Sequence, residues 1–291
     1  MSETSRAMRR AVDAFAGRHV VVVGDLILDE YLFGKPARIS REAPVLILRF
    51  AEREVYLGGA ANAANNVHAL GARVTPVGVI GTDGGGEELV ALFRAGGIAT
   101  GAIVTETART TPMKTRIMAG GYQATRQQVV RVDREPTGEP QPTTEDALLA
   151  RLDALGTRID AIVISDYGYG TVTPRIFEHL KAIARRAGAV VSVDSRYQMP
   201  RFTGVTAATP NEAELEHLTP GCSWSRGAVA AWPCSSGMAR RRSFRSTAPT
   251  RSRTSPVPAT RSSARSRWPW RAARRRCRRR PWRTSRAASS S

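Results

Sequence analysis

The first 220 residues contain no cysteine and no tryptophan, and residues 221–291 contain no aspartate and no glutamate. All three cysteines and all five tryptophans fall after Pro220. Residues 221–291 also lack lysine, leucine, isoleucine, asparagine, glutamine, histidine and tyrosine. A segment without leucine or isoleucine has little with which to build a core. We therefore expect a folded domain over 1–220 and a tail over 221–291 that is disordered or non-native.

The net charge of +19 comes from the tail alone. Residues 221–291 hold 19 of the 44 basic residues, so residues 1–220 hold 25 basic side chains against 25 acidic ones. Clustered arginines with interleaved tryptophans can hold a nucleic-acid backbone and stack on bases. Nucleic-acid binding is therefore one hypothesis for the tail, and non-specific anion binding is another. The cysteine spacing indicates neither a metal site nor a disulfide framework.

Long apolar runs are also missing. No stretch has the length needed to span a bilayer, and residues 1–15 do not have the pattern of a signal peptide. Arg6, Arg9 and Arg10 alternate with apolar residues at helical spacing, which predicts an amphipathic helix. The class expected from these absences is a soluble, cytoplasmic protein with no membrane partner.

Strands and helices alternate along 1–220. A β-branched run over 19–23, which 26–33 continues, predicts a buried first strand. Further strands are expected at 74–80, 160–165, 189–194 and 205–209, and helices at about 62–70, 87–94, 145–155 and 174–187. This alternation predicts an α/β fold with a doubly wound, mostly parallel sheet flanked by helices. Two strand-like segments without a helix between them, about 35–57 and 110–134, predict a small β lid.

The turn at Gly58-Gly59 closes one strand-like segment and opens a helix of small residues. Glycine permits backbone angles closed to other residues, and a helix start presents free N–H groups to a ligand. The amide of Asn62 can both donate and accept hydrogen bonds. Either a ligand turn or a simple tight turn fits this pattern. Asp25 and Asp29 fall at the end of the first strand, where an open α/β sheet binds ligands, although Asp25 can instead cap a turn.

Several motifs together resemble the ribokinase-like (pfkB-type) family of carbohydrate kinases. Residues 77–86 are similar to the family segment V-G-x-x-G-x-D-x-x-G, and residues 209–214 are similar to T-P-N-x-x-E. The segments 38–45 (R-I-S-R-E-A-P-V) and 165–167 (S-D-Y) resemble the heptose-phosphate kinases, the kinase half of ADP-heptose synthesis enzymes. The resemblance covers about 17–220 and implies a kinase for heptose 7-phosphate that uses ATP and Mg²⁺.

The same resemblance implies roles for individual residues. Sugar hydroxyls would be bound by Asp29, Gly58, Gly59 and Asn62. The phosphate already on the sugar would meet at least one of Lys114, Arg116 and Arg131, whose other interpretation is a solvated strand face. The nucleotide path would be lined by Asp194, Asn211 and Glu214, with Glu214 acting on Mg²⁺ through water. A homodimer is also implied.

One family motif is missing. In this family a Gly-Ala-Gly-Asp segment near the C-terminus supplies an anion-binding helix start and the base that takes the proton of the attacking hydroxyl. The sequence contains no Gly-Ala-Gly-Asp. The resemblance therefore implies a chain that binds sugar and turns it over poorly. A non-catalytic sugar-binding or assembly subunit is the alternative.

A change of reading frame accounts for the missing motif. When the third base of each codon over 254–264 becomes the first base of the next, the segment can be read as Val-Thr-Gly-Ala-Gly-Asp-Thr-Val-Ile-Gly. In the shifted reading, the first base of each codon is the third base of a printed codon, which the genetic code leaves largely open. The other two bases are largely set by the printed residues. We therefore interpret 221–291 as an out-of-frame segment that follows a truncated kinase domain.

Overall fold

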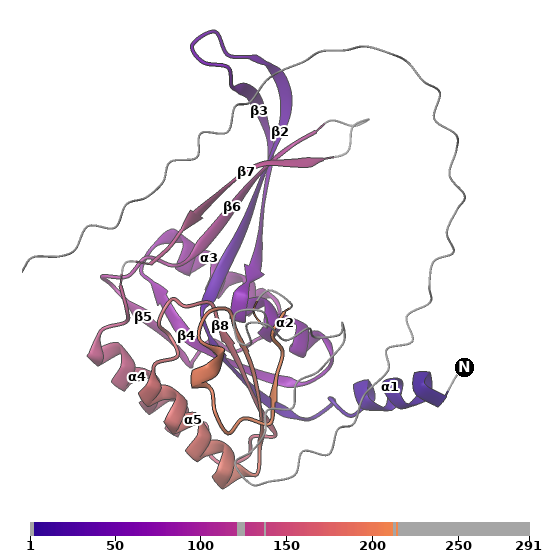
Figure 1. Ribbon diagram of the computed structural model, residues 1–291, viewed down its shortest axis with the longest axis vertical. Helices are drawn as coiled ribbons and strands as arrows, with labels where there is room; N and C mark the ends of the chain where they lie inside the picture. Colours follow the sequence, from indigo (N-terminus) through magenta and orange to yellow (C-terminus); the bar gives the residue numbers. More distant parts are fainter. Residues whose placement is uncertain (1–2, 121–125, 137, 212–213, 215–291) are drawn as a thin grey trace, which may run out of the picture. The chain divides into compact units, whose positions relative to one another are not determined.

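The computed structural model describes residues 3–120, 126–136, 138–211 and 214. A parallel six-stranded main sheet has the order β10-β9-β8-β1-β4-β5 (Figure 1). Its strands are β1 (His19–Gly24), β4 (Arg73–Gly81), β5 (Ile103–Glu106), β8 (Ala161–Asp166), β9 (Val190–Ser195) and β10 (Ala207–Ala208). The expected parallel α/β fold is confirmed, and β5 is a strand that the sequence pattern did not predict.

Helices connect the strands of the main sheet. They are α1 (Glu3–Asp13), α2 (Gly59–Ala69), α3 (Gly84–Ala95), α4 (Pro142–Asp153) and α5 (Pro174–Ala187), with a 3₁₀ turn at Met199–Arg201. The α5 bounds equal the prediction because Thr173 caps its start and Gly188, at φ +65°, ends it. Helix α4 begins at Pro142, three residues before the predicted start, with that proline in its first turn. None of the helices in the described residues is long and apolar enough to cross a membrane.

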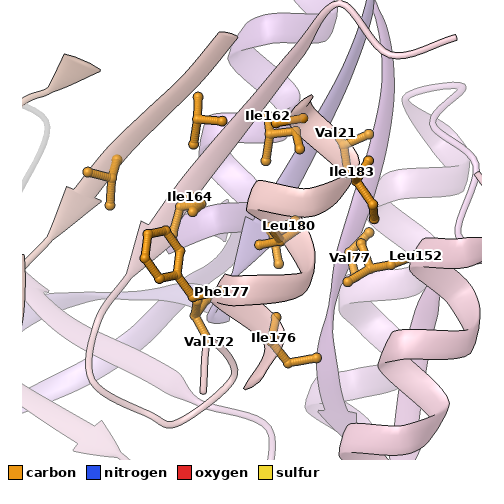
Figure 2. Close-up of a cluster of buried hydrophobic side chains, with 14 of the residues drawn as sticks. Val21, Val77, Leu152, Ile162, Ile164, Val172, Ile176, Phe177, Leu180 and Ile183 are labelled. Atoms are coloured by element: carbon orange, nitrogen blue, oxygen red, sulfur yellow. The ribbon is translucent and has the colours of Figure 1, made fainter. Parts of the chain in front are cut away.

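Both faces of the main sheet are buried. Val21 and Val23 belong to a cluster with α4 and α5, whereas Val20 and Val22 belong to a second cluster with α2 and α3. Figure 2 shows the first cluster, in which the α5 side chains lie against strand residues. Parallel sheets covered on both faces have continuous apolar strands, and this explains the Val-rich run of β1.

A second sheet forms the lid. Its order is β3-β2-β6-β7, made of β2 (Leu26–Ile39), β3 (Leu46–Gly58), β6 (Met113–Ala119) and β7 (Gln127–Arg134). The β2–β3 and β6–β7 pairs are antiparallel hairpins, and β2 pairs with β6 in parallel (Figure 1). The lid is therefore the predicted one with longer strands.

One strand prediction was wrong. Residues 26–33 do not continue the first strand of the main sheet, because the chain leaves that sheet at Gly24 and enters the lid at Leu26. Gly24 has φ +156°, and a Cβ there would lie 1.9 Å from the carbonyl oxygen of Ser165. Only glycine permits this change of direction. The predictions for 221–291 concern residues outside the described part of the chain.

Candidate functional site

The Gly58-Gly59 turn joins β3 to α2 beside two aspartates. A Cβ on Gly58 would lie 2.6 Å from Oδ2 of Asp29, and a Cβ on Gly59 would lie 2.7 Å from the carbonyl oxygen of Asp25. Gly59 also has φ +54°. The turn therefore requires glycine at both positions, and it places the Asp29 carboxylate directly against the main chain. Asn62 lies exposed in the first turn of α2.

Asp29 is held by an arginine of the neighbouring lid strand. Nη1 of Arg116 lies 2.7 Å from Oδ1 of Asp29, and the two side chains are 19% and 22% exposed. The Arg116 guanidinium also lies 5.1 Å from the ring centre of Tyr31. Arg116 was one of three candidates for a sugar phosphate. In this structure its charge is already matched by Asp29.

Lys114 differs from the other two candidates. It is only 7% exposed, and Nζ lies 4.9 Å from the ring centre of Tyr167. Burial lowers the pKa of Lys114, and the positive charge of Arg196 lowers it further. None of the ion pairs found in the described residues involves Lys114, whereas Arg131 pairs with Asp133 at 2.8 Å. A largely buried ammonium without a carboxylate partner is suited to accept an anion.

Lys114 and Arg131 line a cavity of about 550 Å³ between the lid and the loops that follow β7, β8 and β9. Its lining includes three cations (Lys114, Arg131 and Arg196), three carboxylates (Asp133, Glu135 and Glu139) and three tyrosines (Tyr167, Tyr169 and Tyr197). Arg196 and the tyrosines were not among the predicted site residues. The available signal was the position of Arg196 directly after β9, since ligand groups of parallel sheets gather at the carboxyl ends of strands.

Asp25 has the structural role that the sequence left open. Its side chain is 1% exposed, and its carboxylate accepts hydrogen bonds from the backbone N–H groups of Tyr167 (2.7 Å), Tyr169 (3.1 Å) and Thr171 (3.3 Å). Burial raises the pKa of Asp25 although these hydrogen bonds oppose the increase. Asp25 thus caps the loop over 166–171, which forms one wall of the cavity.

Asp83, in the segment 77–86, is also structural. Its carboxylate accepts from the N–H of Gly86 (3.0 Å) at the start of α3. It also accepts from the N–H (3.0 Å) and the hydroxyl (2.6 Å) of Thr111. Asp83 therefore ties the helix to the start of the lid hairpin, two residues before β6.

The three residues predicted for the nucleotide end include a reciprocal pair. The backbone N–H and Nδ2 of Asn211 donate to Glu214 at 2.8 and 2.6 Å, and the N–H of Glu214 donates to Oδ1 of Asn211 at 3.0 Å. This is the arrangement of a capping box. Asp194 lies at the end of β9, and its pKa is raised by shielding from water and by the charge of Glu214.

Oxygen donors for Mg²⁺ are present at this end. Asp194 and Glu214 supply carboxylates, the ligand type that Mg²⁺ prefers. Both Glu214 oxygens already accept from Asn211, so they fit a hydrated ion better than direct ligation. No group of three His, Cys, Asp or Glu side chains able to hold a metal occurs within the described residues.

Comparison with known proteins defines the class. The profile of the pfkB family carbohydrate kinases matches residues 18–233, which is most of the chain and extends past Pro220. The chain therefore belongs to the pfkB family of carbohydrate kinases.

Two curated relatives share about 40% of their residues with this chain over the matched region. Bifunctional protein HldE of Geobacter sulfurreducens is 41% identical over 199 residues, which cover 68% of this chain and 40% of that protein. Bifunctional protein HldE of Pelobacter propionicus is 38% identical over 213 residues, which cover 72% of this chain and 43% of that protein. The chain thus spans less than half the length of these relatives.

Solved structures support the fold. The chain superimposes on phosphofructokinase-2 from Escherichia coli in complex with substrates and products with a TM-score of 0.55 at 18% identity, covering 70% of this chain and 63% of that one. The tetrameric inhibited form of the same enzyme gives a TM-score of 0.53 at 19% identity, covering 69% and 64%. At this identity the similarity shows the ribokinase-like fold alone.

Proposed function

We propose that this chain derives from an ATP-dependent kinase that phosphorylates the anomeric hydroxyl of D-glycero-β-D-manno-heptose 7-phosphate. The product is the 1,7-bisphosphate, a precursor in ADP-heptose and lipopolysaccharide core synthesis. The family membership supports a carbohydrate kinase, and the similarity to bifunctional HldE proteins supports this sugar. The observation that carries the proposal is the buried ammonium of Lys114, which lines the cavity, is in none of the ion pairs found in the described residues, and lies on the strand next to Asp29.

The sugar end of the site is formed at the base of the lid. Asp29 accepts from sugar hydroxyls, and Gly58 and Gly59 let the ligand approach the main chain. Asn62 adds an exposed amide on α2. Asp29 and Lys114 are register partners on β2 and β6, so a hydroxyl-binding group and an anion-binding group lie side by side.

The phosphate end of the sugar is bound by Lys114, with Arg196 as a further cation of the cavity, whereas Arg131 already pairs with Asp133. Charge-assisted hydrogen bonds to phosphate oxygens are stronger than bonds to neutral groups. Arg116 contributes indirectly, because its charge is matched by Asp29. Because three carboxylates also line the cavity, the preference for a phosphorylated sugar over a neutral one rests on the buried ammonium of Lys114.

The nucleotide end uses Asp194, Asn211 and Glu214. Asp194 lies near the end of β9, and Asn211 and Glu214 follow β10, at the carboxyl edge of the main sheet, where such folds bind ligands. An Mg²⁺ ion held here would supply positive charge that offsets the charge of the ATP phosphates. Glu214, with Asp194 beside it, would hold that ion through water.

Turnover is expected to be impaired. Phosphoryl transfer in this family relies on the Asp and glycine N–H groups of Gly-Ala-Gly-Asp, which this sequence lacks. The out-of-frame reading of 254–264 supports loss of the motif through a change of reading frame. The nucleotide sequence across codons 215–225 tests this explanation. A change of frame there requires that another downstream frame encodes Gly-Ala-Gly-Asp.

The test of the function is binding measured beside turnover. Isothermal titration with heptose 7-phosphate is expected to show binding, and the unphosphorylated heptose is expected to bind at least tenfold more weakly, or about 1.4 kcal/mol. A coupled ADP-release assay is expected to show no turnover at the roughly 1–100 s⁻¹ of ordinary kinases. Absence of heptose 7-phosphate binding contradicts the proposed substrate, and ordinary turnover contradicts the impairment.

The alternative of a non-catalytic sugar-binding or assembly subunit is favoured by the same missing motif. It requires a partner chain that restores ADP release when mixed with this one.

A homodimer is the expected assembly of the chain itself, since the lid exposes Ile39, Val45, Leu46 and Phe50. Sedimentation velocity of the wild type and of Phe50→Ser tests that assembly.

Deleting 221–291 tests the nucleic-acid hypothesis for the tail. An unchanged DNA affinity after the deletion removes that hypothesis.

A further inference from the structure

The main chain of Tyr169 is held on both sides by buried charged side chains. Its N–H donates to the Asp25 carboxylate at 3.1 Å, and its carbonyl oxygen accepts from Nη2 of Arg109. Asp25 and Arg109 are 1% and 4% exposed. A buried carboxylate and a buried guanidinium therefore hold the two consecutive peptide groups that flank Cα of Tyr169.

Arg109 makes a second contact with the cavity wall. Its Nη1 donates at 3.0 Å to the carbonyl oxygen of Gly138, and Gly138 lines the same cavity as Tyr169. Its Nε has no hydrogen-bond partner, and none of the ion pairs found in the described residues involves Arg109. Burying such a charge costs free energy, and here the guanidinium is stabilised by hydrogen bonds to two loop carbonyl oxygens.

The gripped loop carries the aromatic wall of the cavity. Tyr167, whose ring contacts Nζ of Lys114, and Tyr169 both lie on it. Gly168 and Gly170 have φ +83° and +86°, so the loop adopts a backbone conformation that few residues favour. Loops of this kind are mobile unless the surrounding structure holds them.

We propose that Arg109 and Asp25 are positioning residues that hold the loop over 166–171 so that Tyr167 and Tyr169 stand ready to receive a phosphorylated ligand beside Lys114. This rests on the proposed function for the identity of the ligand. The loop position itself is a property of the ligand-free protein. Neither residue touches the ligand, because both lie beneath the loop and act through its main chain.

Hydrogen exchange and ligand binding together test this role. Exchange of the Tyr167, Tyr169 and Thr171 amides is measured by NMR in the ligand-free, full-length chain, and binding of heptose 7-phosphate is measured by titration calorimetry. Arg109→Met, which removes both hydrogen bonds and the charge, is expected to speed exchange at these amides about tenfold or more. The Kd for heptose 7-phosphate is expected to rise by a similar factor.

Arg109→Lys keeps the charge and one donor, so its effects are expected to lie between wild type and Arg109→Met. It also keeps the test open if Arg109→Met does not fold. The control is Arg175→Met, which removes two ion pairs on the exposed surface of α5 and is expected to change neither readout.

Acceleration confined to the loop amides, with unchanged exchange in β1, supports the positioning role. Unchanged loop exchange, or equal acceleration in β1 and the loop, overturns it, because Arg109 then has no role or only stabilises the whole domain. If the wild type does not bind heptose 7-phosphate, the proposed function fails, and loop exchange alone still decides whether Arg109 holds the loop.

Discussion

Nη1 of Arg116 lies 2.7 Å from Oδ1 of Asp29 although the two residues are 87 positions apart in the chain. The contact forms because β2 and β6 are parallel neighbours in the lid. Both side chains are largely shielded from water, so the pair is stronger than an exposed ion pair. It holds the Asp29 carboxylate in one orientation against Gly58.

Arg116→Gln is expected to weaken heptose 7-phosphate binding by roughly 1–2 kcal/mol, since Asp29 loses the partner that orients it. Titration calorimetry measures the change. Arg126→Gln is the matched control, because Arg126 pairs with Glu52 at 3.8 Å on the exposed part of the same sheet. Equal losses in the two variants would count against a specific role for the Asp29 pair.

Lys114→Met is expected to reduce affinity for heptose 7-phosphate by about 1.5–3 kcal/mol, the range for a hydrogen bond to a charged group. Affinity for the unphosphorylated heptose is expected to change little, because no anion is then present. Lys114→Arg keeps the charge and is expected to recover part of the loss. Lys181→Met, which removes a surface ion pair on α5, is the control. An equal loss for both sugars would contradict a phosphate contact.

Gly58→Ala is expected to displace the Asp29 carboxylate, because the new Cβ would lie 2.6 Å from Oδ2. Sugar binding is expected to fall at least tenfold, or about 1.4 kcal/mol, with a smaller loss of stability. Gly101→Ala is the control, since a Cβ there meets nothing within 4 Å. Calorimetric titration of both variants measures sugar affinity. Equal affinities would mean that the close approach of Gly58 to Asp29 is not needed for sugar binding.

Asp25 predicts a defined pH dependence. Burial raises its pKa in the folded chain above the ordinary 3.8, so the folded state binds more protons than the unfolded state between these two pKa values. The stability contributed by Asp25 is therefore lost as the pH rises through its folded pKa. Asp25→Asn does not titrate. The difference in free energy of unfolding, wild type minus Asp25→Asn, is expected to decrease from pH 4 upward and then level off. Urea unfolding across this pH range measures it, and a difference that grows with pH would refute the assignment.

Leu180→Ala tests the core beneath α5. Leu180 is 0% exposed and packs in the cluster with Val21, Ile162 and Ile176 (Figure 2). Its truncation is expected to cost about 2–5 kcal/mol of unfolding free energy. Arg185→Ala, on the exposed face of the same helix, is expected to cost at most about 0.5 kcal/mol. Chemical unfolding followed by circular dichroism gives both values.

Most helices and strands followed from local pattern. The bounds of α5 were predicted because Thr173, Pro174 and Gly188 carry their start and stop signals within a few residues. The departure of the chain from the main sheet at Gly24 was missed, because apolar residues resume at Leu26 directly after Gly24-Asp25. The need for glycine at position 24 comes from its close approach to Ser165, which lies far away in the chain.

The amino-acid sequence by itself determined the class of fold, the Gly58-Gly59 turn before a helix, and the absence of Gly-Ala-Gly-Asp, because each depends on residues that are close in the chain. Only the tertiary structure decided which charges are matched. It paired Arg116 with Asp29, buried Lys114 outside the ion pairs found in the described residues, and placed Arg109 against the loop of Tyr169. These outcomes depend on burial and on strand neighbours distant in the chain, which residue spacing does not encode.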